Sequence, residues 1–421
     1  MKTRREFLKS TVTAVAAGWT LPSFIHQTAW SIERSHIASG LQAATGRDNP
    51  ILVILQLGGG NDGLNTVVPF AHDAYYTARP NLAVKASSVL KLGDEFGLNP
   101  ALSGIKSLYD SGNAAIINGV GYPNPNRSHF RSMEIWHTAS DSNKNEHYGW
   151  LGNYFDNTCQ GSPEPSNGIS IGNNPPQAFH GKKQIGISMT SPKSYQFIED
   201  EPTPDGNSET MTGDSINELN GSAPAEDSLQ NLDFLRRTTM DAEVSSETIH
   251  TMTKAQKNTI SYPQTKLGRD LSLVAQLIAG GMPTRVYYVN HGGFDTHANQ
   301  QGTHTRLITE FSNAVSAFCS DLKKMGHFDR VLMMSFSEFG RRVKENGSRG
   351  TDHGVAGPTF LFGGNLKGGC YGKYPSLTDL TKGDLKHNTD FRSIYSTILD
   401  GWLKTNSQSI LKRKFPHMSF I

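Results

Sequence analysis

The sequence predicts an α/β protein, a three-layer αβα sandwich built around a mostly parallel central sheet. Two observations carry this prediction. Apolar runs of strand length recur along the chain, and each ends in glycine or polar residues, as expected for strands covered on both faces of a sheet. Amphipathic stretches of helical period adjoin the later runs, which gives the strand, helix, strand order of βαβ units.

Four strands are expected from the apolar runs, over residues 51–57, 114–120, 285–290 and 331–336. Two helices are expected from apolar stripes at helical spacing. The first stripe consists of Leu267, Leu271, Val274 and Ile278, ahead of Gly280 and Gly281. The second lies between the last two strands and consists of Leu307, Phe311, Ala314, Phe318 and Leu322, closed by Gly326.

The N-terminus carries the pattern of an export signal. Residues 3–9 read TRREFLK, and a modestly apolar stretch follows from about Val12 to Ile25. This is typical of a twin-arginine signal, which a receptor of the twin-arginine translocase reads. The stretch is shorter than the roughly 20 residues that a membrane-spanning helix needs. We therefore expect a periplasmic or otherwise extracytoplasmic protein.

Residues 1–44 are accordingly expected to be signal peptide and spacer. The mature start is expected between Ala29 and Ala44, with an uncleaved anchor as the alternative. Residues 45–421 are expected to form a single domain. Within it, about 199–228 are poor in apolar residues and rich in Pro, Gly, Asn, Ser and acidic groups, which predicts a mobile surface insertion. An interdomain linker is the alternative for that segment.

Composition argues against several classes of function. The formal net charge is +2, and part of the positive charge lies in the signal, so a nucleic-acid groove is not expected. Three cysteines, Cys159, Cys319 and Cys370, do not make a disulfide framework. None has a CxxC partner for a thiolate metal cluster. Cys319 lies among apolar helix residues, so we expect it in the core.

Polar residues collect where the predicted strands end. The first strand runs into residues 58–63, GGGNDG, which fit the dinucleotide-binding pattern in letters only. Asp62 would face the pyrophosphate, and no helix start follows at residues 64–69. We expect the glycines to turn the chain and present Asp62 as a metal ligand. A plain Asn-Asp-Gly turn is the alternative.

The third strand is followed by residues 291–297, HGGFDTH. In an extended segment, residues two apart point to the same side, so Asp295 and His297 can converge on one metal. A carboxylate together with an imidazole suits Zn, Mn or Fe. The alternatives are a helix cap for Asp295 and a surface position for His297.

The fourth strand runs directly into residues 335–342, SFSEFGRR. Glu338 offers a carboxylate at a strand end. Arg341 or Arg342 offers a guanidinium that can hold an anionic group through two hydrogen bonds. A solvated ion pair between Glu338 and an arginine is the alternative.

Residues 350–354, GTDHG, follow shortly after. Asp352 and His353 are neighbours, so their side chains diverge on an extended chain. One is expected to ligate a metal, while the other orients it or binds substrate. A simple turn at Asp352 is the alternative.

Residues 125–130, PNRSHF, precede an amphipathic stretch through Ile135 and Trp136. A helix beginning there would place Ser128 among unpaired backbone N–H groups at the positive end of the helix dipole, where an alkoxide is favoured. A neighbouring metal can activate such a serine as a nucleophile. Serine is also a preferred N-cap residue, so a purely structural cap is the alternative.

Seven short segments occur in one order along the chain. They are residues 59–65 (GGNDGLN), 128–130 (SHF), 149–152 (GWLG), 294–297 (FDTH), 337–341 (SEFGR), 350–354 (GTDHG) and 389–392 (TDFR). Together they resemble the domain of unknown function 1501 family, over nearly everything from Ile51 to about Leu403. That family is similar in fold to the alkaline phosphatase and sulfatase superfamily. The resemblance implies an alkaline-phosphatase-like fold.

Members of that superfamily use two metals and a Ser, Thr or formylglycine nucleophile. The resemblance implies Asp62 for their first-strand aspartate and Ser128 for the nucleophile. It implies Asp295 and His297 for later ligands of the first metal, and His353 for the final histidine.

This chain departs from the superfamily pattern at two places. Glu338 and Phe339 stand where the superfamily has an Asp-His pair, so one imidazole ligand is missing. The spacing from Asp295 to His297 is also shorter than in the superfamily. A one-metal site and a non-catalytic protein therefore stay open beside a complete two-metal site.

We expect an exported metal-dependent hydrolase that cleaves a phosphate or sulfate ester of a small molecule or polysaccharide. One or two divalent ions, Zn, Mn or Ca, are expected to be held by residues from the set Asp62, Asp295, His297, Glu338, Asp352 and His353. Arg127 or Arg341 would neutralise the nonbridging oxygens of the ester.

Two alternatives to the hydrolase remain. The first is a non-catalytic, metal-stabilised binding or assembly protein of the cell envelope. The second is an exported redox protein, which is disfavoured because no flavin, haem or iron–sulfur motif is present in the sequence.

Overall fold

A nine-stranded sheet forms the middle of the structure. Its strands are β1 (Ile51–Leu57), β5 (Ala114–Gly121), β6 (Gly168–Ile171), β7 (Ile187–Met189), β8 (Val286–His291), β9 (Val331–Phe336), β10 (Gly357–Gly363), β11 (Gly369–Tyr371) and β14 (Thr389–Asp390). They lie in the order β11-β5-β10-β9-β1-β8-β6-β7, with β14 paired to β5. Only β10 pairs antiparallel, with β5 and β9; every other pairing among these strands is parallel.

This computed structural model describes residues 49–158, 165–182, 186–192, 249–254 and 256–421. The predicted signal at 1–44, the predicted insertion at 199–228 and Cys159 lie outside the described residues. Residues 47–190 together with 255–421 form one compact unit, to which every strand of the sheet belongs.

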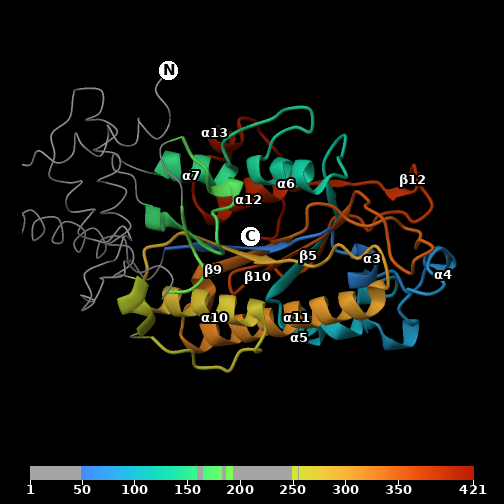
Figure 1. Cartoon of the computed structure of the whole chain (residues 1–421), viewed down its shortest axis with the longest axis horizontal. Coiled ribbons are helices and arrows are strands. Elements are labelled where there is room, and N and C mark those ends of the chain that lie inside the picture. The colour runs from blue at the N-terminus through green and yellow to red at the C-terminus, as the bar shows by residue number, and fades with distance from the viewer. Residues whose placement is uncertain (1–48, 159–164, 183–185, 193–248, 255) are drawn as a thin grey trace, which may run out of the picture. The chain divides into compact units, whose positions relative to one another are not determined.

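Helices cover both faces of the sheet (Figure 1). One face carries α6 (His129–Thr138), α7 (Trp150–Thr158), α12 (Phe391–Thr397) and α13 (Ser407–Leu411). The other carries α5 (Ser103–Asp110), α10 (Lys266–Ala279) and α11 (Gln300–Lys324). The predicted three-layer α/β architecture with a mostly parallel sheet is therefore confirmed.

The predicted elements match the observed ones closely. The first and fourth strands have the predicted bounds, the second and third differ by one residue at their ends, and α10 and α11 contain the two predicted stripes. Cys319 is buried, as expected. One expectation was wrong: a single-turn helix, α3 (Gly63–Thr66), follows Asp62 where no helix start was expected, because the Asp62 side chain caps it by accepting from the Asn65 backbone N–H.

Smaller elements flank the sheet. They are α4 (Asp73–Ala78), a three-stranded antiparallel sheet of β2 (Val67–Val68), β4 (Gly97–Leu98) and β3 (Leu90–Lys91), and a hairpin of β12 (Leu380–Thr381) and β13 (Asp384–Leu385). No helix among the described residues has both the length and the apolar character to cross a bilayer.

Aromatic packing fixes α6 against the end of the sheet. Trp136 stacks on Phe336, the last residue of β9, with ring centroids 4.8 Å apart, and on Phe391 of α12 at 4.3 Å. The Trp136 indole also donates to the Glu338 carbonyl at 2.9 Å. These contacts of Trp136 hold α6 beside the loop that follows β9.

Candidate metal centre

The loops that follow four strands meet at one edge of the sheet. Because β1, β5, β8 and β9 run parallel, their carboxyl ends lie at the same edge. The loop after β8 carries Asp295 and His297, and the loop from β9 to β10 carries Glu338 and His353. The chain after β5 leads to His129 at the start of α6.

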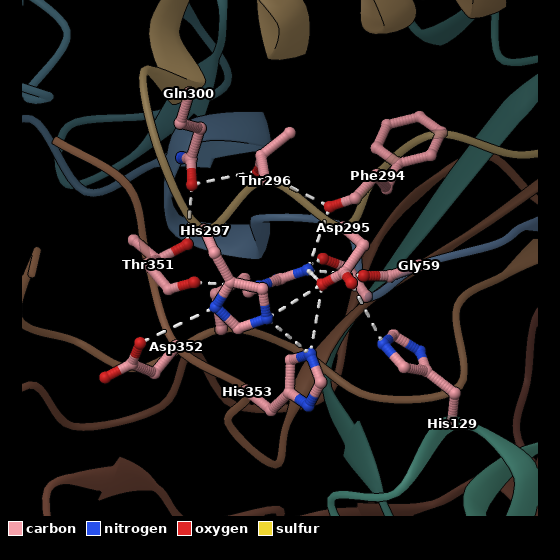
Figure 2. Close-up of polar contacts among 12 residues, drawn as sticks. Gly59, His129, Phe294, Asp295, Thr296, His297, Gln300, Thr351, Asp352 and His353 are labelled. Atoms are coloured by element: carbon pink, nitrogen blue, oxygen red, sulfur yellow. Dashed lines mark hydrogen bonds and ion pairs between the residues drawn. The ribbon is translucent and has the colours of Figure 1, made fainter. Parts of the chain in front are cut away.

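Three imidazoles surround the carboxylate of Asp295 (Figure 2). The Nε2 atoms of His297 and His353 lie 3.0 and 3.1 Å from Asp295 Oδ1. His129 Nε2 lies 3.4 Å from Asp295 Oδ2. Among the described residues, His129, Asp295 and His353 bring ligand atoms within 4.8 Å of one another. We call these three residues, together with His297, the histidine–aspartate cluster.

The far side of each ring faces an oxygen acceptor. His353 Nδ1 lies 2.8 Å from the Arg127 carbonyl, and His129 Nδ1 lies 2.8 Å from Glu338 Oε1. Carbonyl and carboxylate oxygens only accept, so both Nδ1 atoms donate these hydrogen bonds, and both Nε2 atoms face Asp295. Metal-bound histidines in proteins are oriented in this way.

The donor set fits a divalent transition metal. His129 Nε2 is buried and has no hydrogen-bond partner among the described residues, although it faces the cluster, 3.4 Å from Asp295 Oδ2. Three imidazoles and one carboxylate suit Zn or a related ion, whereas Ca prefers oxygen ligands only. Asp295 and His297 are 46 % and 45 % exposed at their side chains, so the cluster is open to solvent on one side.

Asp295 is held in its charged form. Partial burial would raise its pKa, but hydrogen bonds from Arg341 and His353, together with the Arg341 charge, lower the pKa of Asp295 to about 2. The carboxylate is therefore ionised and available as a ligand throughout the neutral range.

Arg341 is buried and ties several loops together. Its Nε donates to the Gly60 carbonyl at 2.6 Å and its Nη1 to the Thr351 carbonyl at 2.7 Å. Its Nη2 donates to the Phe294 carbonyl at 2.9 Å and to Asp295 Oδ1 at 2.8 Å. Arg341 therefore positions Asp295. Because its N–H groups already donate to these acceptors, Arg341 is poorly placed to bind the nonbridging oxygens of a substrate ester, the role that the sequence predicted for it.

Glu338 lies in contact with His129 and is buried. Its Oε1 accepts from His129 Nδ1 and from the Gly59 backbone N–H, both at 2.8 Å. Gly59 has φ +117°, and a Cβ there would lie 2.4 Å from the Asp295 nitrogen, so this approach of two loops requires glycine. The structure thus places Glu338 as the carboxylate that orients His129.

Asp62 does not join the cluster. Its Oδ2 pairs with Arg79 Nη1 at 2.6 Å and accepts from Gln300 Nε2, and the Asp62 and Arg79 side chains are fully buried. Burial would raise the pKa of Asp62, but the Arg79 and His304 charges and the hydrogen bonds from Arg79 and Gln300 hold it below its usual value. The Asp62 carboxylate, predicted as a metal ligand, is thus paired with the Arg79 guanidinium instead.

Asp352 lies at the rim of the cluster and is exposed. Its Oδ1 accepts from Asn346 Nδ2 at 3.2 Å and lies 3.6 Å from His297 Nδ1. Asp352 and His353 are neighbours along the chain. His353 faces Asp295, whereas Asp352 faces Nδ1 of His297, on the side of that ring away from Asp295. The two side chains diverge as the sequence predicted for an adjacent pair, and their roles as ligand and orienting group stay a prediction.

Ser128 occupies the N-cap position of α6 but does not cap it with its side chain. Its backbone N–H donates to Asn126 Oδ1 at 2.8 Å, and the residue is exposed. Its neighbours along the chain both touch the cluster, Arg127 through its carbonyl and His129 through its ring. The Arg127 side chain itself turns to Asp384 of β13.

Sequence reasoning missed His129 and Arg79. His129 stands within the SHF segment, where the adjacent serine drew the interpretation, and its partner Glu338 is 209 residues away along the chain. Arg79 follows the short helix α4 and reaches Asp62 across 17 residues. The position of His129 directly at a predicted helix start was the one signal that could have identified it. We find no such signal for Arg79.

The chain matches the family described as protein of unknown function DUF1501 over residues 109–401. It belongs to the DUF1501 family. The family predicted from the seven segments is thus confirmed. No curated protein matches this DUF1501 chain.

Several solved structures are similar to it at low identity. A protein of the alkaline phosphatase superfamily from Vibrio parahaemolyticus has 9% identity and a TM-score of 0.37, with 87% of this chain and 71% of that chain covered. A sulfatase from Pseudoalteromonas sp. has 10% identity and a TM-score of 0.36, with 89% and 69% covered. A lipoteichoic acid synthase from Listeria monocytogenes has 9% identity and a TM-score of 0.34, with 84% and 80% covered. The interpretation of the cluster rests on its own geometry.

The Asp62→Asn variant separates a structural ion pair from a metal ligand. Removing the negative charge leaves Arg79 buried and unpaired, so we expect the free energy of unfolding to fall by about 3–5 kcal/mol. Metal content per folded protein should stay that of the wild type, whereas Asp295→Asn should lower it. Denaturant unfolding and elemental analysis measure both quantities. Loss of metal from folded Asp62→Asn protein would contradict the placement of Asp62 outside the cluster.

The His353→Ala variant tests the cluster directly. Losing one inward imidazole should weaken metal affinity by more than the roughly 10–100-fold that loss of an orienting partner causes. The melting temperature should fall with it, since metal bound only by the native state adds to stability. His147→Ala, at an exposed position, is the control and should change neither. Full metal occupancy in His353→Ala would remove this residue from the ligand set.

Proposed function

We propose that this DUF1501 protein is an exported metal-dependent hydrolase of phosphate or sulfate esters, with Ser128 as its nucleophile. The observation that supports this most is the juxtaposition of the histidine–aspartate cluster with an exposed serine whose hydroxyl is not used as a helix cap. His129, Asp295, His297 and His353 would hold the metal, and small-molecule or polysaccharide esters are the proposed substrates.

A metal bound by the cluster would act as a Lewis acid, lowering the pKa of a nearby hydroxyl and stabilising charge on the attacked group. The residues of the chain supply the rest. Ser128 Oγ lies at the N-terminus of a ten-residue helix, whose dipole favours the alkoxide. Its attack on phosphorus or sulfur would form a new ester to Ser128 and release the alcohol, and water would then hydrolyse the serine ester.

Three positioning groups would keep this geometry constant during turnover. Glu338 holds the proton of His129 Nδ1, and the Arg127 carbonyl holds that of His353 Nδ1, so neither ring can rotate without losing a hydrogen bond. Arg341 keeps the Asp295 carboxylate directed into the cluster. Such prior orientation removes reorganisation from the chemical step.

The second candidate is a non-catalytic, metal-stabilised binding or assembly protein of the cell envelope. One observation favours it: Asp62, which the sequence predicted as a metal ligand, is instead paired with Arg79 and Gln300. A site with one metal has less charge to stabilise an attacked phosphate or sulfate group.

Ser128→Ala is the variant that decides between the two. We expect it to abolish hydrolysis of aryl phosphate or aryl sulfate esters while metal content and melting temperature stay near those of the wild type, because the hydroxyl makes no capping bond. Ser107→Ala, at an exposed position on α5, is the matched control and should retain activity. Assays use protein loaded with Zn, Mn or Ca at equal folded fraction.

Two results would count against this assignment. A wild-type protein that turns over neither class of ester with any of these metals would favour the binding protein. An active Ser128→Ala variant would move the nucleophile elsewhere.

We also propose export by the twin-arginine pathway, on the basis of residues 3–9. The receptor recognises a guanidinium pair rather than charge alone, so Arg4→Lys with Arg5→Lys should leave folded protein in the cytoplasm. Cell fractionation followed by immunoblotting measures this, with Lys2→Arg as the control that keeps the pair. An unchanged periplasmic yield in the double variant would argue against the pathway.

A further inference from the structure

Two arginines share one buried carboxylate beside the histidine–aspartate cluster. Arg127 Nη2 pairs with Asp384 Oδ2, and Arg342 Nε lies 3.8 Å from Asp384 Oδ1. The Asp384 side chain is 1 % exposed, whereas both arginine side chains are 37 % exposed. The group has two positive charges and one negative, so one positive charge remains uncompensated within it.

Among the described residues, only one of the two arginines hydrogen-bonds Asp384. A buried carboxylate requires one cation, and Arg127 supplies it at hydrogen-bond distance. Arg342 stands too far for a hydrogen bond, and Asp384 Oδ1 has no hydrogen-bond partner among the described residues. Burial and the nearby Arg342 charge both lower the pKa of Arg127.

Both arginines are placed by residues that touch the cluster. The Arg127 carbonyl accepts from His353 Nδ1, and Ser128 follows Arg127 directly. Arg342 follows Arg341, which holds Asp295. Within the described residues, neither guanidinium makes a hydrogen bond or ion pair to the cluster, and both face Asp384 of the β12–β13 hairpin.

We propose that Arg127 and Arg342 form a subsite for a second anionic group of the substrate, a sulfate, phosphate or carboxylate other than the ester that reacts. Guanidinium groups bind such oxyanions through paired hydrogen bonds. In the described part of the chain, the Arg127 side chain hydrogen-bonds only Asp384 and the Arg342 side chain makes no hydrogen bond, which leaves donors of both for an anion. An anion here also compensates the surplus charge. This inference rests on the proposed function and narrows it to polyanionic esters, such as a multiply sulfated or phosphorylated saccharide.

Binding of inorganic sulfate to metal-loaded protein tests the subsite without relying on turnover. We expect wild-type protein to bind sulfate at low ionic strength, measured by isothermal titration calorimetry, and Arg342→Gln to bind it at least about tenfold more weakly. Arg342 is the residue to replace, because Asp384 still has Arg127 as its ion-pair partner after the Arg342 guanidinium is removed. Arg306→Gln, an exposed arginine paired with Glu310 on α11, is the control and should bind as the wild type does.

A second variant locates the bound anion. His297→Ala alters the cluster and leaves both arginines in place, so sulfate affinity should persist if the anion lies at the arginines. Affinity lost in His297→Ala but kept in Arg342→Gln would place the anion at the metal and overturn the subsite. Absence of sulfate binding by the wild type would overturn it as well.

Failure of the subsite and failure of the hydrolase are distinguishable. Sulfate bound through Arg342 by a protein that cleaves no ester would support the subsite and reject the hydrolase. If esters are cleaved, Arg342→Gln should raise the KM of a substrate with a second anionic group at least about tenfold, while kcat and the KM of its singly charged analogue change little. An equal change in KM for both substrates would overturn the subsite.

Discussion

The cluster depends on one buried guanidinium. Arg341 donates to carbonyls in the loops after β1 and β8 and in the loop from β9 to β10, and it also binds the Asp295 carboxylate. The Phe294 carbonyl also accepts from the Thr296 backbone N–H, but the Gly60 and Thr351 carbonyls accept from Arg341 alone among the described residues. Unpaired buried carbonyls are rare in native proteins. One rigid planar group therefore has two roles. It donates hydrogen bonds to backbone carbonyls of three loops, and it orients the Asp295 carboxylate. Lysine could not do both, because its ammonium presents no planar fork.

The elements that could be predicted from the sequence are those specified by a local pattern of apolar residues. Continuous apolar runs gave β1 and β9 with their observed bounds, and helical stripes gave α10 and α11. β10 was not predicted because it starts Gly-Pro and offers only a short apolar run, so its identity as a strand comes from pairing with β5 and β9. Tertiary context decides such strands, and a single sequence does not contain that context in local form.

The same division holds for the site. Asp295, His297 and His353 were predicted from glycine-rich loops after strands, where topology brings polar residues together, and the structure brings these three together. Asp62 and Glu338 were predicted as ligands on the same grounds, and the structure pairs them with Arg79 and His129 instead. Sequence shows that a carboxylate lies at a strand end. Which cation or ring it meets depends on contacts across 17 and 209 residues of chain, and no local pattern records these.

The antiparallel direction of β10 has a consequence for how the site can vary. A parallel successor to β9 would need a crossover that carries the chain to the opposite edge of the sheet. β10 instead runs back beside β9, so residues 337–356 begin and end at the edge where the cluster lies. Glu338, Arg341, Arg342, Asp352 and His353 are all delivered by this one return loop. Insertions or substitutions there can reshape the rim of the site while the pairing of β9 with β10, and with it the sheet, stays as it is.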